Sequence, residues 1–489
     1  MKRFTGIALA AFMAAGIQGC YNLRGSSGGG QTEFQRPRIV NSADIALHEG
    51  YKIEVVATGL TFPSGIAFDG KGRAFVVESG YSYGEMWTTP RLLRLEDGRG
   101  VAVITEGGKN GPWTGAAFHN GNFYVAEGGA LEGGRILRIS PEGHTTVLVD
   151  NLPSRGDYHT NGPVIGPDGM LYFGQGAATN SAVVGEDNFK SGWARRFPGL
   201  HDTPCQDITL TGVNYESKDF SKPDSKETVS TGAYSPFGTS TKPGQAVKGG
   251  VPCNGAVMRL PIDGGKPELV AWGFRDPSGL AFSPEGRLYV ADNRYDERGS
   301  RPVFGAADLL WEVKPGSWYG WPDFNGNSPL NEHDHYKPPG KERPSLLLSK
   351  EPAAPPEPAA IFPVHSSPGG FDFSRSEEFG FEGEAFVAEF GDGAPDTGKV
   401  LAPVGFKVVR VNIKSGNTEE FAANKGEMNG PASWLKKGGL ERPVAARFNP
   451  DGTALYVVDF GVILHDREGP KPVTGTGAVW RITKKNSDK

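Results

Sequence analysis

Long stretches with the 3.6-residue period of an amphipathic helix are hard to find after residue 30 of this 489-residue chain. Basic residues are not in excess either: Lys and Arg number 51, Asp and Glu number 56, and the net charge is −5. Charges of both signs are interspersed, which argues against a nucleic-acid partner. A serine nucleophile elbow, a Walker loop and a Rossmann fingerprint are all missing. These absences exclude helical solenoids and several common classes of enzyme.

Cysteine is scarce, with three residues, and the first of them ends an export-like segment. Lys2 and Arg3 precede the apolar run Ile7–Ile17, which is too short to span a bilayer stably. We interpret residues 1–20 as a lipoprotein signal peptide that ends at a lipidated Cys20, with an ordinary secretory signal as the alternative. Residues 21–48 then form a flexible, Gly/Ser-rich tether. We expect an exported protein on the periplasmic side of a bacterial membrane or at the cell surface, attached only through lipid.

The other two cysteines, Cys205 and Cys253, enclose a polar stretch without clear periodicity. An oxidising compartment permits a disulfide between them, and the even number favours one. Two unrelated thiols are the alternative. A bridge would fix the base of a long insertion.

Glycine and proline are abundant, with 71 and 38 residues, and they punctuate a pattern that occurs six times. Each copy has a small or Pro-containing start, Gly, a short apolar strand, a turn and a second apolar strand with a polar end. The copies span residues 63–78, 113–127, 160–175, 277–292, 368–389 and 443–459. Gly with Asp, Asn or Glu in the turn is typical of tight hairpins.

Repeats built only of strands cannot bury their faces alone, and radial closure removes their exposed edges. We therefore predict an all-β fold: a six-bladed β-propeller over residues 49–485, with a pair of β-sandwiches as the alternative. Extra length follows the third copy, at about residues 178–253, and the fourth, at about residues 294–362. We expect these inserted loops to cover one face.

Two rings of side chains are expected at one mouth of the channel, because the start of strand one and the end of strand two lie at the same end of a hairpin. The first ring holds Phe62, Pro112, His159, Asp276, Ser367 and Arg442, with Arg275 one position earlier. The second ring holds Glu78, Glu127, Gln175, Asp292, Glu389 and Asp459. Crowded carboxylates need cations or hydrogen-bond donors, and Ca²⁺ is one candidate. The alternative is that each acid caps its own blade through backbone hydrogen bonds.

His159 is the one histidine in either ring. An imidazole titrates near neutrality and suits a general base at a channel mouth, although many histidines are only structural.

Three segments, Gly156–Gly176, Trp272–Asp292 and Lys314–Phe324, resemble those of a known family. This family is that of the glucose/sorbosone dehydrogenases. Its members are six-bladed propellers that depend on pyrroloquinoline quinone (PQQ) and act on sugars and related alcohols. Lys314–Phe324 resembles the family's Gly-x-x-Tyr-Gly-Trp-Pro segment, and the last repeat, from Leu440, resembles its final repeat. The similarity is spread over most of residues 50–485.

The resemblance implies roles for the first ring. His159 would take a hydroxyl proton from the substrate as hydride passes to the quinone, while Arg275, Asp276 and Arg442 would contact the cofactor. Asp276 stands where the family has asparagine. The family's cofactor lysine in the fifth repeat has no clear counterpart, and Lys399 is the candidate.

The resemblance also implies a Ca²⁺ held through backbone carbonyls just after the fourth copy. The expected metal-site residues are Asn293, Arg294 and Tyr295, with the neighbouring Asp292.

We therefore expect a PQQ-dependent oxidoreductase that oxidises a sugar, sugar aldehyde or polyol and passes electrons to an unknown acceptor. The alternatives are a Ca²⁺-dependent hydrolase of the lactonase type, in which His159 activates water, and a non-catalytic propeller that binds glycans or proteins.

Overall fold

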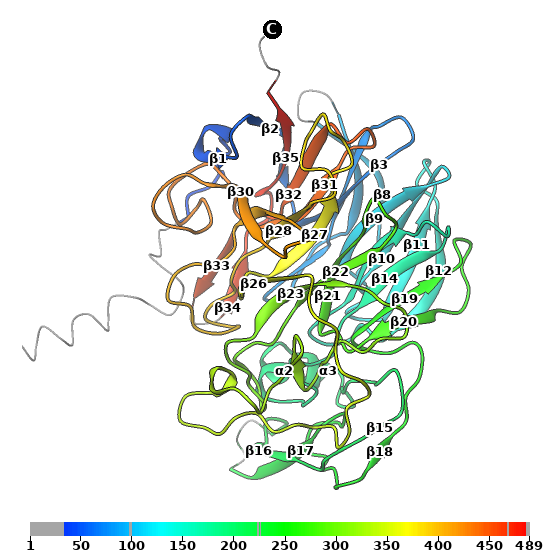
Figure 1. The fold of residues 1–489 in the computed structure, drawn as a ribbon, viewed down its shortest axis with the longest axis vertical. Helices are drawn as coiled ribbons and strands as arrows, with labels where there is room; N and C mark the ends of the chain where they lie inside the picture. The colour runs from blue at the N-terminus through cyan, green and yellow to red at the C-terminus, as the bar shows by residue number, and fades with distance from the viewer. Residues whose placement is uncertain (1–33, 97–99, 223, 225, 467–468, 486–489) are drawn as a thin grey trace, which may run out of the picture.

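The computed structural model describes residues 34–96, 100–222, 224, 226–466 and 469–485 (Figure 1). The expected signal peptide and Cys20 lie outside the described residues. Within these ranges, helix is confined to short segments: η1 (Ser42–Asp44), α2 (Glu186–Lys190), α3 (Trp193–Arg196) and η3 (Asp334–Tyr336). Among the described residues, no helix combines the length and apolar character needed to cross a bilayer.

Each of the six sequence repeats folds into an antiparallel strand pair. Four sheets have four strands each: β3 (Pro63–Phe68), β4 (Ala74–Glu78), β7 (Arg91–Leu95) and β8 (Val101–Glu106); β9 (Trp113–His119), β10 (Asn122–Glu127), β11 (Gly134–Ile139) and β12 (Thr145–Leu152); β13 (Thr160–Ile165), β14 (Leu171–Gln175), β19 (Ala256–Leu260) and β20 (Glu268–Trp272); β21 (Asp276–Phe282), β22 (Leu288–Asn293), β23 (Ala307–Glu312) and β26 (Ala360–Val364). The expected all-β propeller arrangement is confirmed.

A fifth, nine-stranded sheet contains the remaining two repeats. Its strand order is β1 (Ile45–Leu47), β30 (Thr418–Asn424), β29 (Lys407–Val411), β28 (Ala385–Glu389), β27 (Pro368–Phe373), β31 (Pro443–Phe448), β32 (Ala454–Asp459), β35 (Gly477–Lys484) and β2 (Tyr51–Leu60). A single parallel residue pair, Gly370 with Ala445, joins its two halves. N-terminal β2 is the outer strand beside C-terminal β35, so the sheet holds both ends of the folded chain (Figure 1).

The core lies between neighbouring sheets. Strands β4, β14 and β28 are buried along almost their whole length, whereas the outer strands β8 and β12 consist almost entirely of exposed and half-buried residues. Such continuous apolar strands are expected where both faces of a sheet are covered. Ile66, Val76 and Leu93 of the first sheet pack against Val458 and Val479 of the last one, which closes the propeller.

The repeat glycines lie where first strands of neighbouring sheets touch. β3 contacts β9, β9 contacts β13, and the series continues through β21, β27 and β31 back to β3. A Cβ atom on Gly65 would lie 2.8 Å from the Cα of Gly115, and one on Gly115 would lie 2.7 Å from the carbonyl oxygen of Gly162. Contacts that short are repulsive, so close packing around the axis requires glycine at these positions.

We predict that Gly115→Ala lowers the free energy of unfolding by about 1–3 kcal/mol, because the new methyl group meets rigid backbone. Gly108→Ala is the matched control, since a Cβ there has nothing within 4 Å. Thermal and urea unfolding of both variants measure the difference. Equal stability of the two variants would contradict the packing argument.

Two stretches between strands form a lobe beside the sheets, in the lower part of Figure 1. Residues 176–255 include α2, α3, β15 (Ile208–Thr209), β16 (Asn214–Lys218), β17 (Thr228–Gly232) and β18 (Ala246–Val247); residues 313–359 include β24 (Phe324–Asn325), β25 (Ser328–Pro329) and η3. Leu210 and Leu348 form a bridge between the two stretches. Cys205 and Cys253 form a disulfide within the first, which confirms the predicted pairing.

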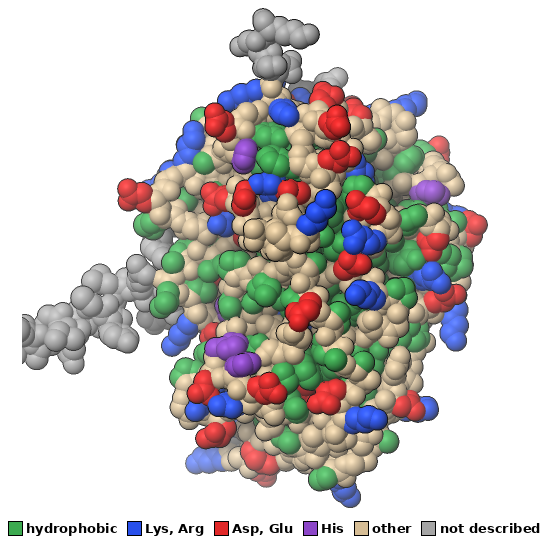
Figure 2. Space-filling model, viewed as in Figure 1, with side chains coloured by type: hydrophobic (Ala, Val, Ile, Leu, Met, Phe, Trp, Pro, Cys, Tyr) green, Lys and Arg blue, Asp and Glu red, His purple; other side chains and the backbone are tan. Residues whose placement is uncertain are grey.

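The packed chain begins before residue 49, where the propeller was expected to start. Arg38 donates to the carboxylate of Asp459 at 2.5 Å, and β1 pairs with β30. On the face shown in Figure 2, acidic and basic side chains are interspersed over both the sheets and the lobe.

Candidate functional site

Carboxylates at the ends of second strands hold the residues at the start of first strands. Asp292 accepts hydrogen bonds from the backbone N–H groups of Arg275 and Asp276, at 3.1 and 2.9 Å. Asp459 accepts one from the backbone N–H of Arg442 at 2.9 Å. A buried carboxylate is stable when N–H donors surround it. Both acids therefore cap their own strand pairs and fix the main chain at the mouth.

His159 lies half-buried just before β13, beside an aromatic wall. Its Nδ1 lies 3.1 Å from the carbonyl oxygen of Ser154, and its ring has edge contacts with Tyr81 and Trp193 at centroid distances of 5.9 and 6.1 Å. A carbonyl oxygen can only accept, so Nδ1 carries the proton and Nε2 has the free lone pair. Burial lowers the pKa of His159 below its ordinary value of 6.5, although the Ser154 carbonyl opposes this. The imidazole is therefore a neutral base near pH 7.

Arg275 is fully engaged by the protein. Its guanidinium pairs with Asp296 at 2.5 Å and stacks on Tyr158 at 4.4 Å from the ring centroid. Its Nη1 also donates to the carbonyl oxygens of Asn293, at 3.2 Å, and Arg294. Tyr158 directly precedes His159, so these contacts bring the arginine of the fourth repeat next to the histidine of the third.

Asp276 lies between two carboxamides at the mouth. Its oxygens accept from Nδ2 of Asn161 at 3.1 Å and from Nδ2 of Asn293 at 2.9 Å. Burial raises the pKa of Asp276 to about 6, and these hydrogen bonds and Arg275 offset only part of the effect. Asp276 therefore changes charge close to neutral pH.

Arg442 is a buried cation without a direct carboxylate partner among the described residues. It donates to the carbonyl oxygen of Asp392 at 3.0 Å and lies 5.0 Å from the ring centroids of both Phe390 and Phe406. Its Nη2 lies 3.5 Å from Nε2 of His465. Burial lowers the pKa of Arg442, and the more distant charges of Asp392, Glu441 and Asp459 offset only part of this effect. Its environment fits an anionic ligand.

Sequence reasoning missed the hairpin of β5 (Tyr81–Ser82) and β6 (Met86–Trp87), which crosses the mouth. Its tip touches the separate two-stranded hairpin of β33 (Ile463–Asp466) and β34 (Gly469–Pro472), because a Cβ on Gly84 would lie 2.2 Å from the carbonyl oxygen of Pro470. The sequence feature that could have revealed this hairpin is the extra, aromatic-rich segment between the second and third strands of the first repeat. That segment occurs in only one copy, so it is not part of the repeat pattern.

Tyr83, at the tip of this hairpin, connects the two sides of the site. Its ring lies 5.9 Å from that of Phe390, and it is 55 % exposed. Nevertheless burial raises the pKa of Tyr83 to about 12. Asp276 adds to this rise, whereas Arg442 and Arg275 oppose it. The structure thus brings His159, Arg275, Asp276 and Arg442 to one mouth, with Tyr83 between them.

The four expected metal-site residues are arranged differently from the expectation. The carboxylate of Asp292 receives two backbone N–H bonds and pairs with Arg294 at 2.6 Å. Tyr295 is buried and donates to the carbonyl oxygen of Phe324. The carbonyls of Asn293 and Arg294 accept from Arg275, so a guanidinium stands where the Ca²⁺ was expected. Ca²⁺ takes six to eight oxygen ligands, waters among them. Here the two carbonyls and the Asp292 carboxylate already bond to arginines and backbone N–H groups, so this donor set as arranged does not fit the ion.

Metal-binding side chains do not cluster elsewhere in the described part of the chain: no group of three or more His, Cys, Asp or Glu is placed to hold an ion. The side chain of Lys399 is exposed, and its backbone N–H donates to Glu297 at 3.2 Å. Its contact with a cofactor stays a prediction.

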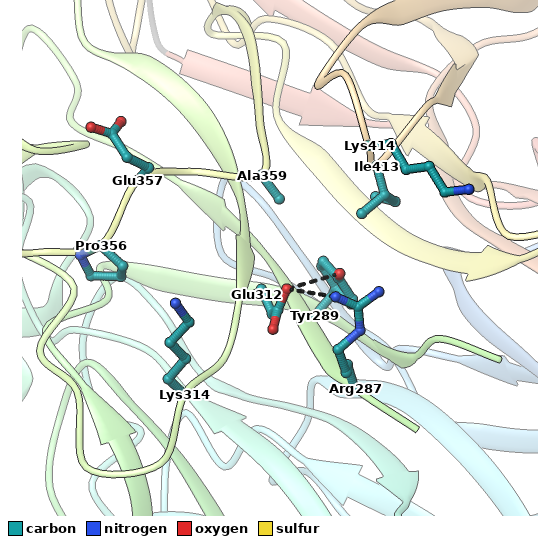
Figure 3. A pocket seen from close by; sticks show the side chains of 9 residues that line it. All are labelled: Arg287, Tyr289, Glu312, Lys314, Pro356, Glu357, Ala359, Ile413 and Lys414. Atoms are coloured by element: carbon teal, nitrogen blue, oxygen red, sulfur yellow. Dashed lines mark hydrogen bonds and ion pairs between the residues drawn. The ribbon is translucent and has the colours of Figure 1, made fainter. Parts of the chain in front are cut away.

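A separate groove lies at the opposite end of the fourth sheet (Figure 3). Arg287 follows the turn between β21 and β22, and its guanidinium and the hydroxyl of Tyr289 both bind Glu312. These polar groups satisfy one another, and none belongs to the mouth. We therefore assign the candidate site to the mouth.

The sequence matches no family model and no curated protein. Solved structures do share its fold. The PQQ domain of pyranose dehydrogenase from Coprinopsis cinerea has a TM-score of 0.53 at 14 % identity, covering 93 % of this chain and 98 % of its own. A Trichoderma reesei protein of carbohydrate-active enzyme family AA12 has a TM-score of 0.53 at 16 % identity, covering 93 % of this chain and 100 % of its own.

The soluble aldose sugar dehydrogenase from Escherichia coli has a TM-score of 0.50 at 14 % identity, covering 89 % of this chain and 100 % of its own. The structural neighbours thus include sugar dehydrogenases and a PQQ domain, consistent with the resemblance seen in the sequence. At these identities the likeness shows the fold, and chemistry must come from the site.

We predict that Asp276→Asn stabilises the protein near neutral pH and leaves its stability nearly unchanged near about pH 3, below the ordinary pKa of an aspartate. The folded pKa of Asp276 is raised from 3.8 to about 6, so ionisation destabilises the fold progressively across that window. An asparagine stays neutral, and the Oδ1 of Asn293, which lacks a hydrogen-bond partner within the described part of the chain, can accept from it after an amide flip. Melting temperatures of both proteins at the two pH values test this. A gain of equal size at both would show that the charge is not its source.

Proposed function

We propose that this chain is an oxidoreductase that removes hydride from a sugar or a related alcohol, with His159 as the base for the hydroxyl proton. The observation that carries the proposal is the single tautomer that Ser154 imposes on His159. Because Nδ1 donates to a carbonyl, Nε2 is left without a proton and has no hydrogen-bond partner among the described residues. It can accept a proton from a hydroxyl group placed within hydrogen-bond distance.

The aromatic wall supports this role. Tyr81 and Trp193 restrict the imidazole to one orientation and exclude water from one side of the ring. Apolar ring faces next to a hydrogen-bonding base also suit a sugar, which has both C–H faces and hydroxyl groups.

An anionic quinone such as PQQ fits the other side of the mouth. Arg442 is the buried cation that lacks a direct carboxylate partner among the described residues, and the rings of Phe390 and Tyr83 offer flat surfaces beside it. Arg275 and Asp276 would flank the same ligand. Bound PQQ would supply the two-electron acceptor for hydride. No role is assigned to Ca²⁺, because its expected ligands are engaged by Arg275.

The proposed fold is a six-bladed propeller. The nine-stranded sheet is held together by one residue pair between β27 and β31, so each of its halves counts as one blade. With the four separate sheets this makes six, one for each sequence repeat.

The metal-dependent hydrolase is less well supported, since the acidic ring is used for capping. Asp292 and Asp459 are occupied by backbone N–H groups and arginines, which leaves few free oxygens for an ion. No specific contact favours the non-catalytic alternative.

We also infer export and lipid anchoring through Cys20. The disulfide between Cys205 and Cys253 supports an oxidising compartment. Electrons would pass to an acceptor outside the cytoplasm, with a sugar or polyol as the small-molecule partner.

We predict that His159→Ala, reconstituted with PQQ, loses at least about 100-fold in turnover of an aldose panel, measured by dye reduction, with no change in melting temperature. His144→Ala is the control, because that histidine is exposed and distant from the mouth. Activity of the parent should fall only below pH 6.5, where His159 gains a proton. Full turnover by the alanine variant would remove the histidine from the mechanism; no turnover by the parent would remove the oxidoreductase.

We predict that Arg442→Gln weakens PQQ binding by roughly 10- to 100-fold, the usual effect of one charge-assisted hydrogen bond. Titration calorimetry measures this without catalysis. Arg447→Gln is the matched control, since Arg447 lies on the same strand, β31, toward the opposite end of the sheet. If both variants bind PQQ as the parent does, the anion site is elsewhere.

A further inference from the structure

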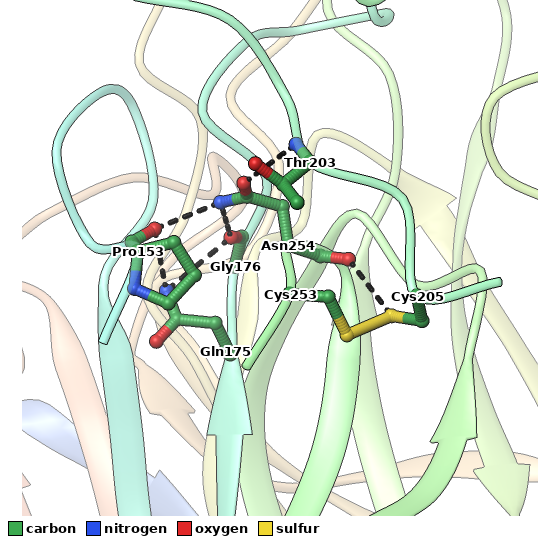
Figure 4. The surroundings of a disulfide bond; sticks show 7 residues. All are labelled: Pro153, Gln175, Gly176, Thr203, Cys205, Cys253 and Asn254. Atoms are coloured by element: carbon green, nitrogen blue, oxygen red, sulfur yellow. Dashed lines mark hydrogen bonds between the residues drawn. A yellow bond between two sulfur atoms is a disulfide. The ribbon is translucent and has the colours of Figure 1, made fainter. Parts of the chain in front are cut away.

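Asn254 joins the disulfide-linked lobe to the loop that carries His159 (Figure 4). It directly follows Cys253 and precedes β19. Its Nδ2 donates to the carbonyl oxygen of Pro153 at 2.8 Å and to that of Gly176 at 3.0 Å, while its Oδ1 accepts from the backbone N–H of Thr203 at 3.0 Å. Both N–H groups of Nδ2 and one acceptor site of Oδ1 are therefore bonded to backbone that is distant in sequence.

Both carbonyls that Asn254 holds lie next to contacts of His159. Pro153 precedes Ser154, whose carbonyl fixes the imidazole tautomer. The backbone N–H of Gly176 donates to the carbonyl oxygen of His159 at 3.0 Å. One carboxamide thus spans the two segments that set the ring and the main chain of His159.

The disulfide fixes Asn254 itself. Cys253 is bonded to Cys205, and the backbone N–H of Asn254 donates to the carbonyl oxygen of Thr203 at 3.0 Å. The Sγ of Cys205 also lies 3.5 Å from the carbonyl oxygen of Asn254. Since a disulfide sulfur carries no proton, this is a close contact and not a hydrogen bond. Cys253 and Asn254 are therefore both tied to residues 203–205, the first by the disulfide and the second by hydrogen bonds to Thr203.

We propose that Asn254 is a positioning residue for His159, held in place by the Cys205–Cys253 disulfide. Through Pro153 and Gly176 it keeps the Ser154 carbonyl aimed at Nδ1, which keeps Nε2 free of a proton. The kinetic consequence rests on the proposed function, whereas the effect on the tautomer does not.

The expected effect is partial, because Asn254 is not the sole support. Nε2 of Gln175 also donates to the carbonyl of Pro153, at 3.1 Å, and the hydroxyl of Thr160 contacts that of Ser154 at 2.6 Å. Loss of Asn254 should loosen the loop without releasing it.

The test compares Asn254→Asp with Asn214→Asp. An aspartate cannot donate to the two carbonyls and would repel them. Asn214 is a matched control in the same lobe, since its Nδ2 donates to two carbonyls at 2.9 Å and its Oδ1 accepts a backbone N–H at 2.7 Å, but it has no contact with the His159 loop. Asn254→Ser serves as a second variant if the aspartate prevents folding.

Nitrogen-15 NMR of the His159 ring is the primary readout. The two ring nitrogens should have well-separated shifts in the parent and in Asn214→Asp, and they should move toward each other in the Asn254 variants as the second tautomer becomes populated. Unchanged ring shifts in folded Asn254 variants, or the same change in the Asn214 variant, would overturn the proposal.

Kinetics give the second readout. With an active parent, the Asn254 variants should lose roughly 10-fold in kcat with little change in KM, because misplacing a base affects the transition state more than binding. An equal loss in Asn214→Asp would indicate a general structural effect and contradict the proposal. If the parent itself has no turnover, the proposed function fails while the ring shifts still decide the positioning role.

Discussion

The first strands of neighbouring sheets approach so closely around the axis that no side chain fits between them at the repeat glycines. A Cβ on Gly279 would lie 2.1 Å from the carbonyl oxygen of Gly369, and one on Gly115 would lie 2.7 Å from that of Gly162. This spacing draws together whatever residues precede those glycines. His159, Asp276 and Arg442 come from distant parts of the sequence, and they share one mouth because the strands that follow them belong to one closed ring of touching strands.

The buried charged groups at the mouth are stabilised in two different ways. Arg275 lies against Asp296, and the capping carboxylates Asp292 and Asp459 are satisfied by backbone N–H groups. Arg442 has only neutral acceptors as direct partners within the described chain, so its guanidinium pays a desolvation penalty that a bound anion would relieve. The site is thereby divided into an anion-binding side and a proton-accepting side, with Tyr83 between them.

The repeats were sufficient to predict the strand pairs, the propeller arrangement and the mouth, because hairpin geometry fixes which ends of strands lie together. The disulfide followed from cysteine number and compartment. Other features depend on contacts that leave no local pattern. The guanidinium of Arg275 lies on the carbonyls expected to bind Ca²⁺, which depends on one side-chain conformation. Likewise Asn254 bonds to Pro153, about a hundred positions earlier, and nothing near it in sequence indicates that partner.

The hydrogen bonds of His159 distinguish a chemical role from a structural one. A histidine that only supports a fold tends to have both ring nitrogens bonded within the protein, since an unsatisfied nitrogen weakens the packing around it. Here the lobe, the loop after β12 and the end of β14 all contribute to holding one nitrogen, Nδ1, on Ser154, whereas the other nitrogen is left without a partner in the described chain. Supporting one side of the ring that firmly while leaving the other side open is the arrangement that a proton acceptor requires.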